Sequence, residues 1–447
     1  MIPASPRALL ESCLAAAVRS ADPRPAMDRA LATRTPPDVP VYIIAAGKAS
    51  RAMAESLVAW LARHQREPAG GIVVETESGG AIHPSLASYT GDHPLPAAAS
   101  GAAAQAIHRL VGTIPSGAAV HVAISGGASS LIAGPLPELA MDDVAVLFRL
   151  LLHSGLDIDA VNAVRKRVTR WSAGRLALAC HPCTMTTWIV SDVPGDDVST
   201  VGSGPCVVDP WTVEALQGVL HESGVGARMP VGLQAACRRD TPAAELIPGV
   251  ESIIIASNRT AMQGAVGAAQ EAGCVIRAAD ELLSGSAATT GRRVAATTIR
   301  AAIEWHAQNA ALVEEGFGAS IKPLFLVWGG ETTVQIAEDP GRGGRCQELA
   351  LAAAEALEVS PHPVTLLAAG TDGRDGSTDA AGAVVDNTTW ERLRKRGIDG
   401  TAALETHDAH PALESVGALV RTGPTGTNVM DLVLAVVMPS FRTDASR

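Results

Sequence analysis

The stretch VYIIAAGKAS, residues 41–50, sets the pattern of the chain: a short run of Val and Ile, then glycine, then a helical stretch. Similar apolar runs return at GIVVE, AVHVAI and TTWIVSD, with Ala-rich helical stretches between them. Short buried runs that alternate with helices are typical of parallel strands joined by crossover helices. We therefore expect an α/β fold whose N-terminal part is a Rossmann-like parallel sheet with flanking helices.

A second series of apolar runs begins at SIIIAS, residues 252–257, and continues through CVIRA, PLFLVWGG, TTVQIA and VTLLAAG to ALVRTG. The segment between the two series, 222–249, has weak periodicity and many helix-breaking residues. At 447 residues the chain is also too long for one ordinary core. We expect an N-terminal domain over 1–245 and a smaller α/β domain over 246–447.

Composition excludes several classes of function. The net charge is −11 and no basic surface cluster is visible, which argues against a nucleic-acid partner. No segment approaches the roughly 18 apolar residues of a membrane span. Glu11 interrupts the apolar part of the N-terminus, which makes it a poor signal peptide. Seven scattered cysteines fit a reducing compartment. We expect a soluble, cytoplasmic protein without membrane partners.

Glycine-rich loops follow several of the expected strands. In ISGGASS, the residues Ser125, Gly126, Gly127, Ala128 and Ser129 form a candidate cradle for an anion, although an ordinary strand-to-helix turn has the same composition. Lys48 is one of four lysines against 31 arginines and follows a strand-end glycine, as a mobile point charge would. Arg345 offers a planar fork for carboxylate or phosphate. For both side chains, a solvated position at a helix start is the alternative.

Carboxylates accompany these loops. Asp192 and Glu331 each follow an apolar run, and TDGRDGSTDAAG, residues 371–382, contains Asp372, Asp375 and Asp379. Magnesium uses one or two protein carboxylates together with substrate phosphates, so these loops contain enough carboxylates for a magnesium site. Asp372 lies just beyond VTLLAAG, at the expected mouth of the sheet, so we predict that it acts on magnesium or the attacking hydroxyl. Asp375 and Asp379 are predicted to shape the loop.

Together these motifs resemble the class II glycerate kinases, the glycerate 2-kinases whose C-terminal part is called the MOFRL domain; some members are labelled hydroxypyruvate reductase. The resemblance runs from AAGKAS to TGPTGTNVMDL, and its most specific motifs are SDVPGDD, GGETTV, GRGGRCQELAL and TDGRDGSTDAAGA. It implies a two-domain α/β kinase that closes a cleft around ATP, Mg²⁺ and D-glycerate. A homodimer is one assembly that we consider.

The resemblance also implies roles for particular residues. Its essential lysine and arginine fall on Lys48 and Arg345, with Asp372 beside them as a third catalytic residue. The remaining assignments are phosphate binding by Ser125, Gly126, Gly127, Ala128, Ser129, Gly329, Gly330 and Thr425, substrate binding by His93, Arg165 and Arg175, and metal binding by Asp192, Glu331 and Asp372.

Two departures from the family pattern concern the substrate. Ser172 stands where a lysine is usual, and Cys346 stands where an asparagine is usual. The loss of a cation or an amide changes which carboxylates and hydroxyls of a small acid find hydrogen-bond partners. We therefore predict that the substrate preference is shifted away from plain D-glycerate, or that the preference for it is at least weakened. A hydroxypyruvate dehydrogenase is the first alternative function, although no G-x-G-x-x-G follows a strand. A non-catalytic sensor of sugar acids is the second.

Overall fold

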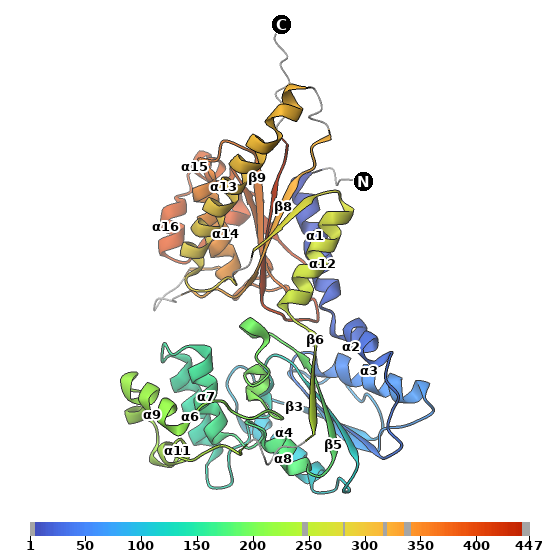
Figure 1. Ribbon diagram of the computed structural model, residues 1–447. Helices are drawn as coiled ribbons and strands as arrows, with labels where there is room; N and C mark the ends of the chain where they lie inside the picture. The colour runs from blue at the N-terminus through green and yellow to red at the C-terminus, as the bar shows by residue number, and fades with distance from the viewer. Residues whose placement is uncertain (1–4, 244–248, 280–281, 316–319, 335–340, 440–447) are drawn as a thin grey trace. The chain divides into compact units, whose positions relative to one another are not determined.

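The computed structural model describes residues 5–243, 249–279, 282–315, 320–334 and 341–439 (Figure 1). They form two compact units. We call Pro23–Ser257 the parallel-sheet unit, and Met1–Asp22 with Asn258–Arg447 the mixed-sheet unit. Each unit has a six-stranded sheet with helices packed against it, so the expected α/β class is confirmed for both.

All strand pairs in the described sheet of the parallel-sheet unit are parallel, in the order β3-β2-β1-β4-β5-β6. This is the strand order of a Rossmann fold, in which ligands bind where the order reverses, here at the carboxyl ends of β1 and β4. The strands are β1 (Val41–Ala46), β2 (Gly70–Glu75), β3 (Leu86–Thr90), β4 (Ala119–Ile124), β5 (Thr184–Val190) and β6 (Val250–Ala256).

Helices cover both faces of this sheet, and a further group packs beside it (Figure 1). Ile44, Val122 and Ile124 of the sheet share a buried core with Ile107 and Leu176 of the covering helices. A second apolar cluster joins α6, α7, α9 and α11. The helices are α2 (Pro23–Leu31), α3 (Ser50–Arg63), α4 (Ala98–Val111), α5 (Ala128–Leu131), α6 (Met141–Leu152), α7 (Ile158–Val168), α8 (Arg175–Cys180), α9 (Val213–Glu222), α10 (Val225–Arg228) and α11 (Val231–Ala236), with short 3₁₀ turns η1 (Pro194–Asp196) and η2 (Val201–Ser203).

The mixed-sheet unit has the strand order β11-β10-β9-β12-β8-β7, in which only β7 and β8 pair in parallel. Helices α1 and α12 lie on one face, and α13, α14 and the C-terminal helices lie on the other (Figure 1). The strands are β7 (Val275–Ala278), β8 (Leu324–Gly330), β9 (Val364–Gly370), β10 (Gly382–Asp386), β11 (Leu419–Val420) and β12 (Asp431–Val437); the helices are α1 (Pro6–Ser20), α12 (Asn258–Glu271), α13 (Ala287–Glu314), α14 (Arg345–Leu357), α15 (Thr389–Lys395), α16 (Gly400–Glu405) and α17 (Ala409–Ser415).

The division of the chain differs from the sequence expectation in two places. The run SIIIAS supplies β6, which pairs with β5 and closes the first sheet instead of opening the second. Helix α1 belongs to the mixed-sheet unit, where Arg7 donates hydrogen bonds to the carbonyls of Gly417 and Leu419. The expected run TTVQIA lies partly outside the described residues.

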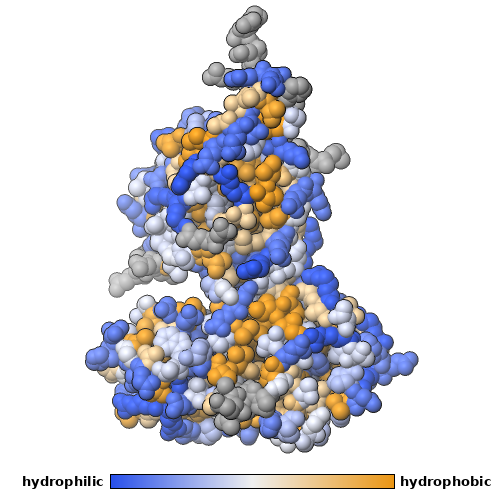
Figure 2. All heavy atoms as spheres, viewed as in Figure 1, coloured by the Kyte–Doolittle hydropathy of each residue, from blue (hydrophilic) through white to orange (hydrophobic). Residues whose placement is uncertain are grey.

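Two surface properties bear on function. In the ranges that the structure describes, no helix has the length and apolar character needed to cross a membrane. On the face seen in Figure 2, apolar side chains gather over the edge strand β6, where Ile254 is 38% exposed.

Candidate functional site

The loops after β1 and β4 are joined by backbone hydrogen bonds at the reversal point of the parallel sheet. Lys48 N–H donates to the Gly126 carbonyl at 2.9 Å, and Ser125 N–H donates to the Ala46 carbonyl at 3.1 Å. The Ser125 hydroxyl accepts from Ala49 N–H at 2.9 Å. Gly47 has a φ of 126°, and a Cβ there would lie 2.1 Å from Ser125 Oγ, so only glycine permits this approach. The double loop is rigid and leaves the Lys48 side chain exposed.

His93 and Asp192 flank the glycines of this double loop. A Cβ on Gly127 would meet His93 Cδ2 at 3.1 Å, and a Cβ on Gly126 would meet Asp192 Oδ2 at 2.1 Å. Burial lowers the pKa of His93, and the charges of Lys48 and Arg165 lower it further. Burial raises the pKa of Asp192, while Lys48 opposes that shift. The structure therefore brings together predicted residues from the ends of β1, β3, β4 and β5.

Arg165, on α7, is a half-buried cation that pairs with no carboxylate in the described part of the chain. Its guanidinium lies 4.5 Å from the centre of the Phe148 ring, and its buried Nε has no hydrogen-bond partner in the described part of the chain. Burial lowers its pKa from the ordinary arginine value to about 10, so it remains charged at neutral pH. Because a buried N–H group without a hydrogen-bond partner is costly, this side chain is suited to receive an anion.

Other residues predicted for this unit have structural partners. Arg175 Nη1 donates to the carbonyls of Lys166, Thr169 and Ser172 and thereby holds the turn between α7 and α8. The Ser129 hydroxyl lies 2.9 Å from that of Ser203. The Ser125 hydroxyl accepts a hydrogen bond from Ala49 N–H, as described above, and Ala128 is buried in the core.

In the mixed-sheet unit, Arg345 is the first residue of α14 and forms a fork with Asp431. Nε lies 2.6 Å from Asp431 Oδ2, and Nη2 lies 2.9 Å from Oδ1. Nη1 is 2.5 Å from Glu331 Oε1. Burial opposes the charge of Arg345, but the hydrogen bonds and ion pairs with these carboxylates raise its pKa above the ordinary value. Arg345 is thus fully ionised and shared between two acids.

The three aspartates of 371–382 have different surroundings. Asp372 Oδ1 accepts from Arg374 N–H at 3.0 Å, and a Cβ on Gly370 would lie 3.3 Å from this oxygen and 3.5 Å from Asp431 Oδ1. Asp372 and Asp431 therefore flank the same glycine. Asp379 is exposed and pairs with Arg421 at 2.7 Å.

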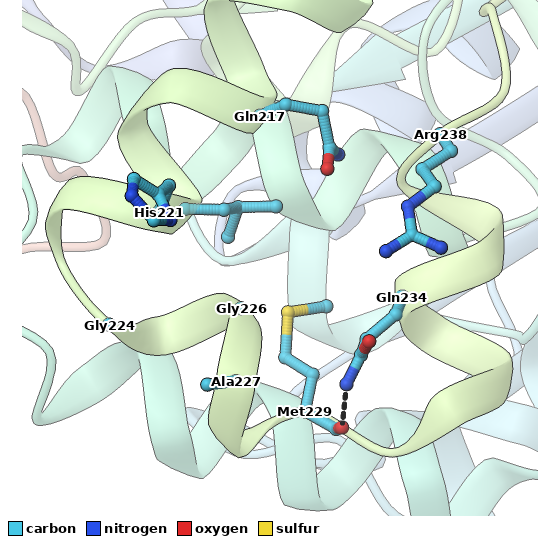
Figure 3. Close-up of a pocket in the computed structure, with 9 residues that line it drawn as sticks. Gln217, His221, Gly224, Gly226, Ala227, Met229, Gln234 and Arg238 are labelled. Atoms are coloured by element: carbon cyan, nitrogen blue, oxygen red, sulfur yellow. Dashed lines mark hydrogen bonds between the residues drawn. The ribbon is translucent and has the colours of Figure 1, made fainter.

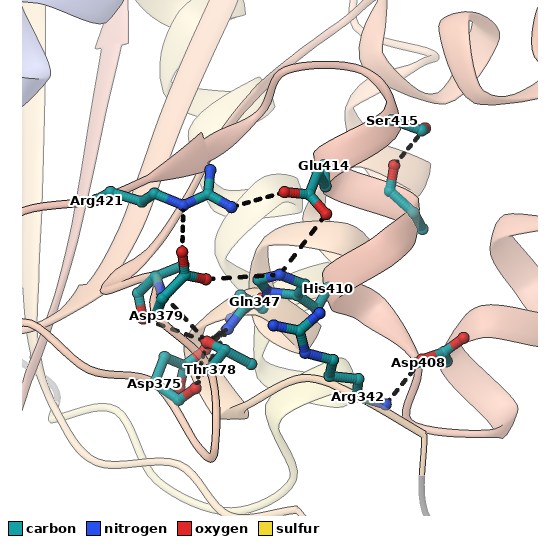
Figure 4. A network of polar contacts seen from close by, with 12 residues as sticks. Arg342, Gln347, Asp375, Thr378, Asp379, Asp408, His410, Glu414, Ser415 and Arg421 are labelled. Atoms are coloured by element: carbon teal, nitrogen blue, oxygen red, sulfur yellow. Dashed lines mark hydrogen bonds and ion pairs between the residues drawn. The ribbon is translucent and has the colours of Figure 1, made fainter.

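Asp375 is buried and caps the first turn of α14. Its oxygens accept from Cys346 N–H at 3.0 Å and Gln347 N–H at 2.7 Å. The Gln347 side-chain amide donates to Asp375 Oδ2 at 3.0 Å and to Thr378 Oγ1 at 2.9 Å. Its Oε1 lies 2.8 Å from His410 Nδ1 (Figure 4). Asp375 shapes the loop, as predicted, and the N–H groups it uses are not free for phosphate.

Gly329, Gly330 and Thr425, which were predicted to bind phosphate, lie in close packing. A Cβ on Gly329 would be 1.7 Å from Asn258 Oδ1, and one on Gly330 would be 2.4 Å from the Leu283 carbonyl oxygen. Thr425 Oγ1 donates to the Thr371 carbonyl at 2.6 Å. Packing alone thus accounts for both glycines, and their role toward phosphate stays a prediction.

A cavity of about 540 Å³ lies against Arg345 and Glu331. Gly341, Gly343 and Gly344 also line it, together with Thr332, whose buried hydroxyl has no hydrogen-bond partner in the described chain. Within the described ranges, no group of three or more His, Cys, Asp or Glu side chains is placed to hold a metal ion. Asp192 belongs to the parallel-sheet unit, whereas Glu331 and Asp372 belong to the mixed-sheet unit.

A further cavity, of about 220 Å³, lies among α9, α10 and α11 and is lined by Gln217, His221, Gln234 and Arg238 (Figure 3). It contains none of the predicted residues. Asp431, in contrast, belongs to the site but was missed by the sequence analysis. An aspartate directly before the apolar run LVLAVV was its only signal.

Comparisons with known proteins cover nearly the whole chain. Residues 9–238 match the domain of unknown function DUF4147, and residues 324–431 match the MOFRL family. The glycerate 2-kinase of Pyrococcus horikoshii is 33% identical over 89% of this chain and 87% of its own length.

The chain belongs to the glycerate kinase family.

The glycerate kinase fold is shared in three dimensions as well. The crystal structure of glycerate kinase from Thermotoga maritima superposes with a TM-score of 0.80 and 31% identity, covering 96% of this chain and 99% of that one. A putative hydroxypyruvate reductase of Agrobacterium vitis is 35% identical over 96% of this chain and 94% of its length. As a glycerate kinase family member, the chain is a phosphotransferase. Its DUF4147 region contains Lys48, His93 and Arg165, and its MOFRL region contains Arg345 and Asp372.

Proposed function

We propose that this protein is an ATP-dependent kinase that phosphorylates the 2-hydroxyl of D-glycerate or a closely related small hydroxy acid. The observation that carries this proposal is the half-buried side chain of Arg165, near His93 and Lys48, whose buried Nε has no hydrogen-bond partner among the described residues. A small carboxylate would give Arg165 the partner that it lacks, since a guanidinium binds carboxylate through two parallel hydrogen bonds.

Each residue of this cluster then has a role. Arg165 holds the carboxylate of the acid, and neutral His93, whose pKa is lowered, hydrogen-bonds to a hydroxyl or carboxylate oxygen. Lys48 neutralises negative charge on the transferring phosphoryl group, because a flexible ammonium can follow that group during transfer. Asp192 lies near this cluster, since the charge of Lys48 opposes the rise that burial causes in the pKa of Asp192.

The cavity beside Arg345 suits the nucleotide. Its size, its glycines and the unpartnered Thr332 hydroxyl fit a polyphosphate better than a three-carbon acid. Glu331 and Asp372 are the residues that we propose to hold Mg²⁺, which when bound neutralises the phosphate oxygens. Arg345 orients the phosphates. We further propose that the clusters of both units serve one reaction.

The alternative functions are less well supported. A hydroxypyruvate reductase would need a nicotinamide site, yet the loop after β1 carries Lys48 and lacks the glycines of a dinucleotide fingerprint. A non-catalytic sensor would have no use for the second cluster around Arg345.

The test is a comparison of two assays on the purified protein. We expect ADP release with D-glycerate, ATP and Mg²⁺, and no change in nicotinamide absorbance with hydroxypyruvate. Hydride transfer without ADP release would replace the kinase with the reductase, and binding of the acid without either activity would favour the sensor. A panel of three- and four-carbon hydroxy acids locates the preferred substrate.

A further inference from the structure

Asp431 is a deeply buried charged group of the mixed-sheet site. Its residue is 3% exposed, and it is the first residue of β12, which lies between β8 and β9 in the sheet. Its backbone pairs with Gly330 on one side and Gly370 on the other. Asn258 Nδ2 donates to its carbonyl at 3.0 Å. The carboxylate is therefore attached to a backbone that is fixed from both sides.

Arg345 differs from Asp431 in its access to the cavity. The Arg345 side chain is 35% exposed and lines the 540 Å³ cavity, whereas Asp431 is not among its lining residues. Both oxygens of Asp431 are engaged by Arg345, at 2.6 and 2.9 Å. A ligand in the cavity would therefore meet the arginine and leave the aspartate behind it.

The two ends of Arg345 are also fixed independently. Its backbone begins α14, whose first turn is capped by Asp375, and its guanidinium is held by Asp431. An unrestrained arginine samples many rotamers, and ordering it during the reaction costs free energy. With Nε and Nη2 bound to Asp431, Nη1 is the guanidinium nitrogen that pairs with Glu331, which lines the cavity together with Arg345.

We propose that Asp431 is the positioning residue of the phosphoryl-transfer site: it orients the Arg345 guanidinium toward the cavity without touching either ligand. This inference rests on the proposed role of Arg345 in the kinase reaction. It predicts that the position of the carboxylate matters as much as its charge, because a displacement of about 1 Å at a catalytic group can cost about a hundredfold in rate.

The experiment compares kcat and KM for ATP and the acid in Asp431→Glu, Asp431→Asn, Arg345→Ala and the Arg345→Ala/Asp431→Asn double variant. Asp431→Glu keeps the ion pair but moves it, so we expect a kcat reduced about tenfold or more with the circular dichroism spectrum unchanged. Asp431→Asn should lower kcat at least as much. The double variant should equal Arg345→Ala within about twofold, because a residue that acts only through Arg345 has no further effect once Arg345 is gone.

Asp379→Asn is the matched control, because Asp379 forms a 2.7 Å pair with Arg421 that is exposed. It should leave kcat unchanged. Full activity of Asp431→Glu would overturn the inference, and so would a double variant about tenfold slower than Arg345→Ala, which would mean an independent role. If Asp431→Asn does not fold, the comparison of Asp431→Glu with the natural protein still decides. Full activity of Arg345→Ala would instead contradict the proposed function of the site.

Discussion

At the scale of single residues, the parallel-sheet site is defined by how its charges influence one another. Lys48 and Arg165 both lower the pKa of His93, and burial acts in the same direction. The imidazole is therefore neutral at pH 7 and can donate from one nitrogen while accepting at the other. Two cations and a neutral histidine would suit the proposed hydroxy acid, whose carboxylate is negatively charged and whose 2-hydroxyl can donate or accept a hydrogen bond.

Lys48→Ala should abolish turnover and raise the pKa of His93. The loss of turnover follows because a cation at the phosphoryl group contributes several kcal/mol to the transition state. The pKa rises because the neighbouring positive charge that now lowers it is removed. Steady-state kinetics and an NMR titration of His93 measure the two effects. Lys395→Ala, at an exposed helix position, is the control; a Lys48→Ala variant with more than about a tenth of normal kcat would remove Lys48 from the mechanism.

Asp372→Asn should reduce kcat by about a hundredfold or more, whereas Asp379→Asn should leave it almost unchanged. The reason is location. Asp372 and Asp431 both lie next to Gly370, and Asp431 binds Arg345, whereas Asp379 is exposed and pairs with Arg421 at the surface. Kinetics over a magnesium titration check this. An active Asp372→Asn together with an inactive Asp379→Asn would reverse the assignment.

The two departures from the family pattern are buried, which changes how they can act. Ser172 lies 2.6 Å from the Thr169 hydroxyl, and its carbonyl accepts from Arg175. Cys346 is buried next to Asp431 and Asp375, and burial raises the pKa of its thiol well above the ordinary value. Ser172 contacts Arg175 and Cys346 is next to Arg345, and through these arginines the two positions would act on the substrate. The predicted preference for another acid stays a prediction.

At the scale of secondary structure elements, the start of α14 depends on an acid from another segment. Gly344 precedes the helix without a capping side chain, and a Cβ there would lie 2.4 Å from Asp375. Glycine thus admits the carboxylate to the N–H groups of the first turn, an arrangement that also favours negative charge at a helix N-terminus. Burial raises the Asp375 pKa to about 6, so the group is mostly ionised at neutral pH.

Asp375→Ala should lower the free energy of unfolding of the mixed-sheet unit by about 1–3 kcal/mol, because buried N–H groups of α14 lose their acceptor. Urea unfolding followed by fluorescence measures this. Asp379→Ala is the control because it removes an acid from the same loop at an exposed position. Equal stability of the two variants would show that the cap contributes little.

The elements also show what local sequence patterns can and cannot predict. Val- and Ile-rich runs identified β1, β2, β4 and β5 of the parallel sheet, because burial on both faces makes such runs continuous. They did not identify the edge strand β3, whose sequence LASYT is largely exposed and has no such run. The same signal could not assign β6, since Ile253–Ile255 fits either sheet and only the pairing with β5 decides. Asp431 was missed for a related reason: its importance lies in contacts 86 residues away along the chain. Lys48, His93 and Asp192 could be grouped because parallel strands end at one edge of a sheet.

At the scale of the whole molecule, membership of the glycerate kinase family agrees with an architecture of two α/β units, each with its own charged cluster. The α1 helix illustrates what remained unpredictable, because it begins the chain yet packs in the mixed-sheet unit through Arg7. The unit to which a terminal helix belongs depends on distant contacts, which leave no periodic signal in the sequence.

His121 should make stability depend on pH. Burial lowers its pKa from 6.5 to about 4, so the folded state binds the proton less well than the unfolded state. The contribution of neutral His121 to the free energy of unfolding is fully present above pH 6.5. It is lost as the pH falls toward 4, by up to about 3 kcal/mol. His121→Gln does not titrate and can still accept from Trp188 Nε1, the present donor to His121. Urea unfolding between pH 4 and 7.5 should show that the free energy of unfolding falls more steeply with falling pH in the natural protein than in His121→Gln. The same pH dependence in both proteins would show that His121 is not responsible.

The position of the phosphate in the product tests the central claim most directly. After turnover of D-glycerate with ATP and Mg²⁺, phosphorus–proton coupling in the NMR spectrum identifies the carbon that bears the phosphate. We expect coupling to the single proton on C2, because Arg165 is proposed to hold the carboxylate and thereby to present the neighbouring hydroxyl for transfer. Coupling to the two protons on C3, or no phosphorylated acid at all, would contradict it.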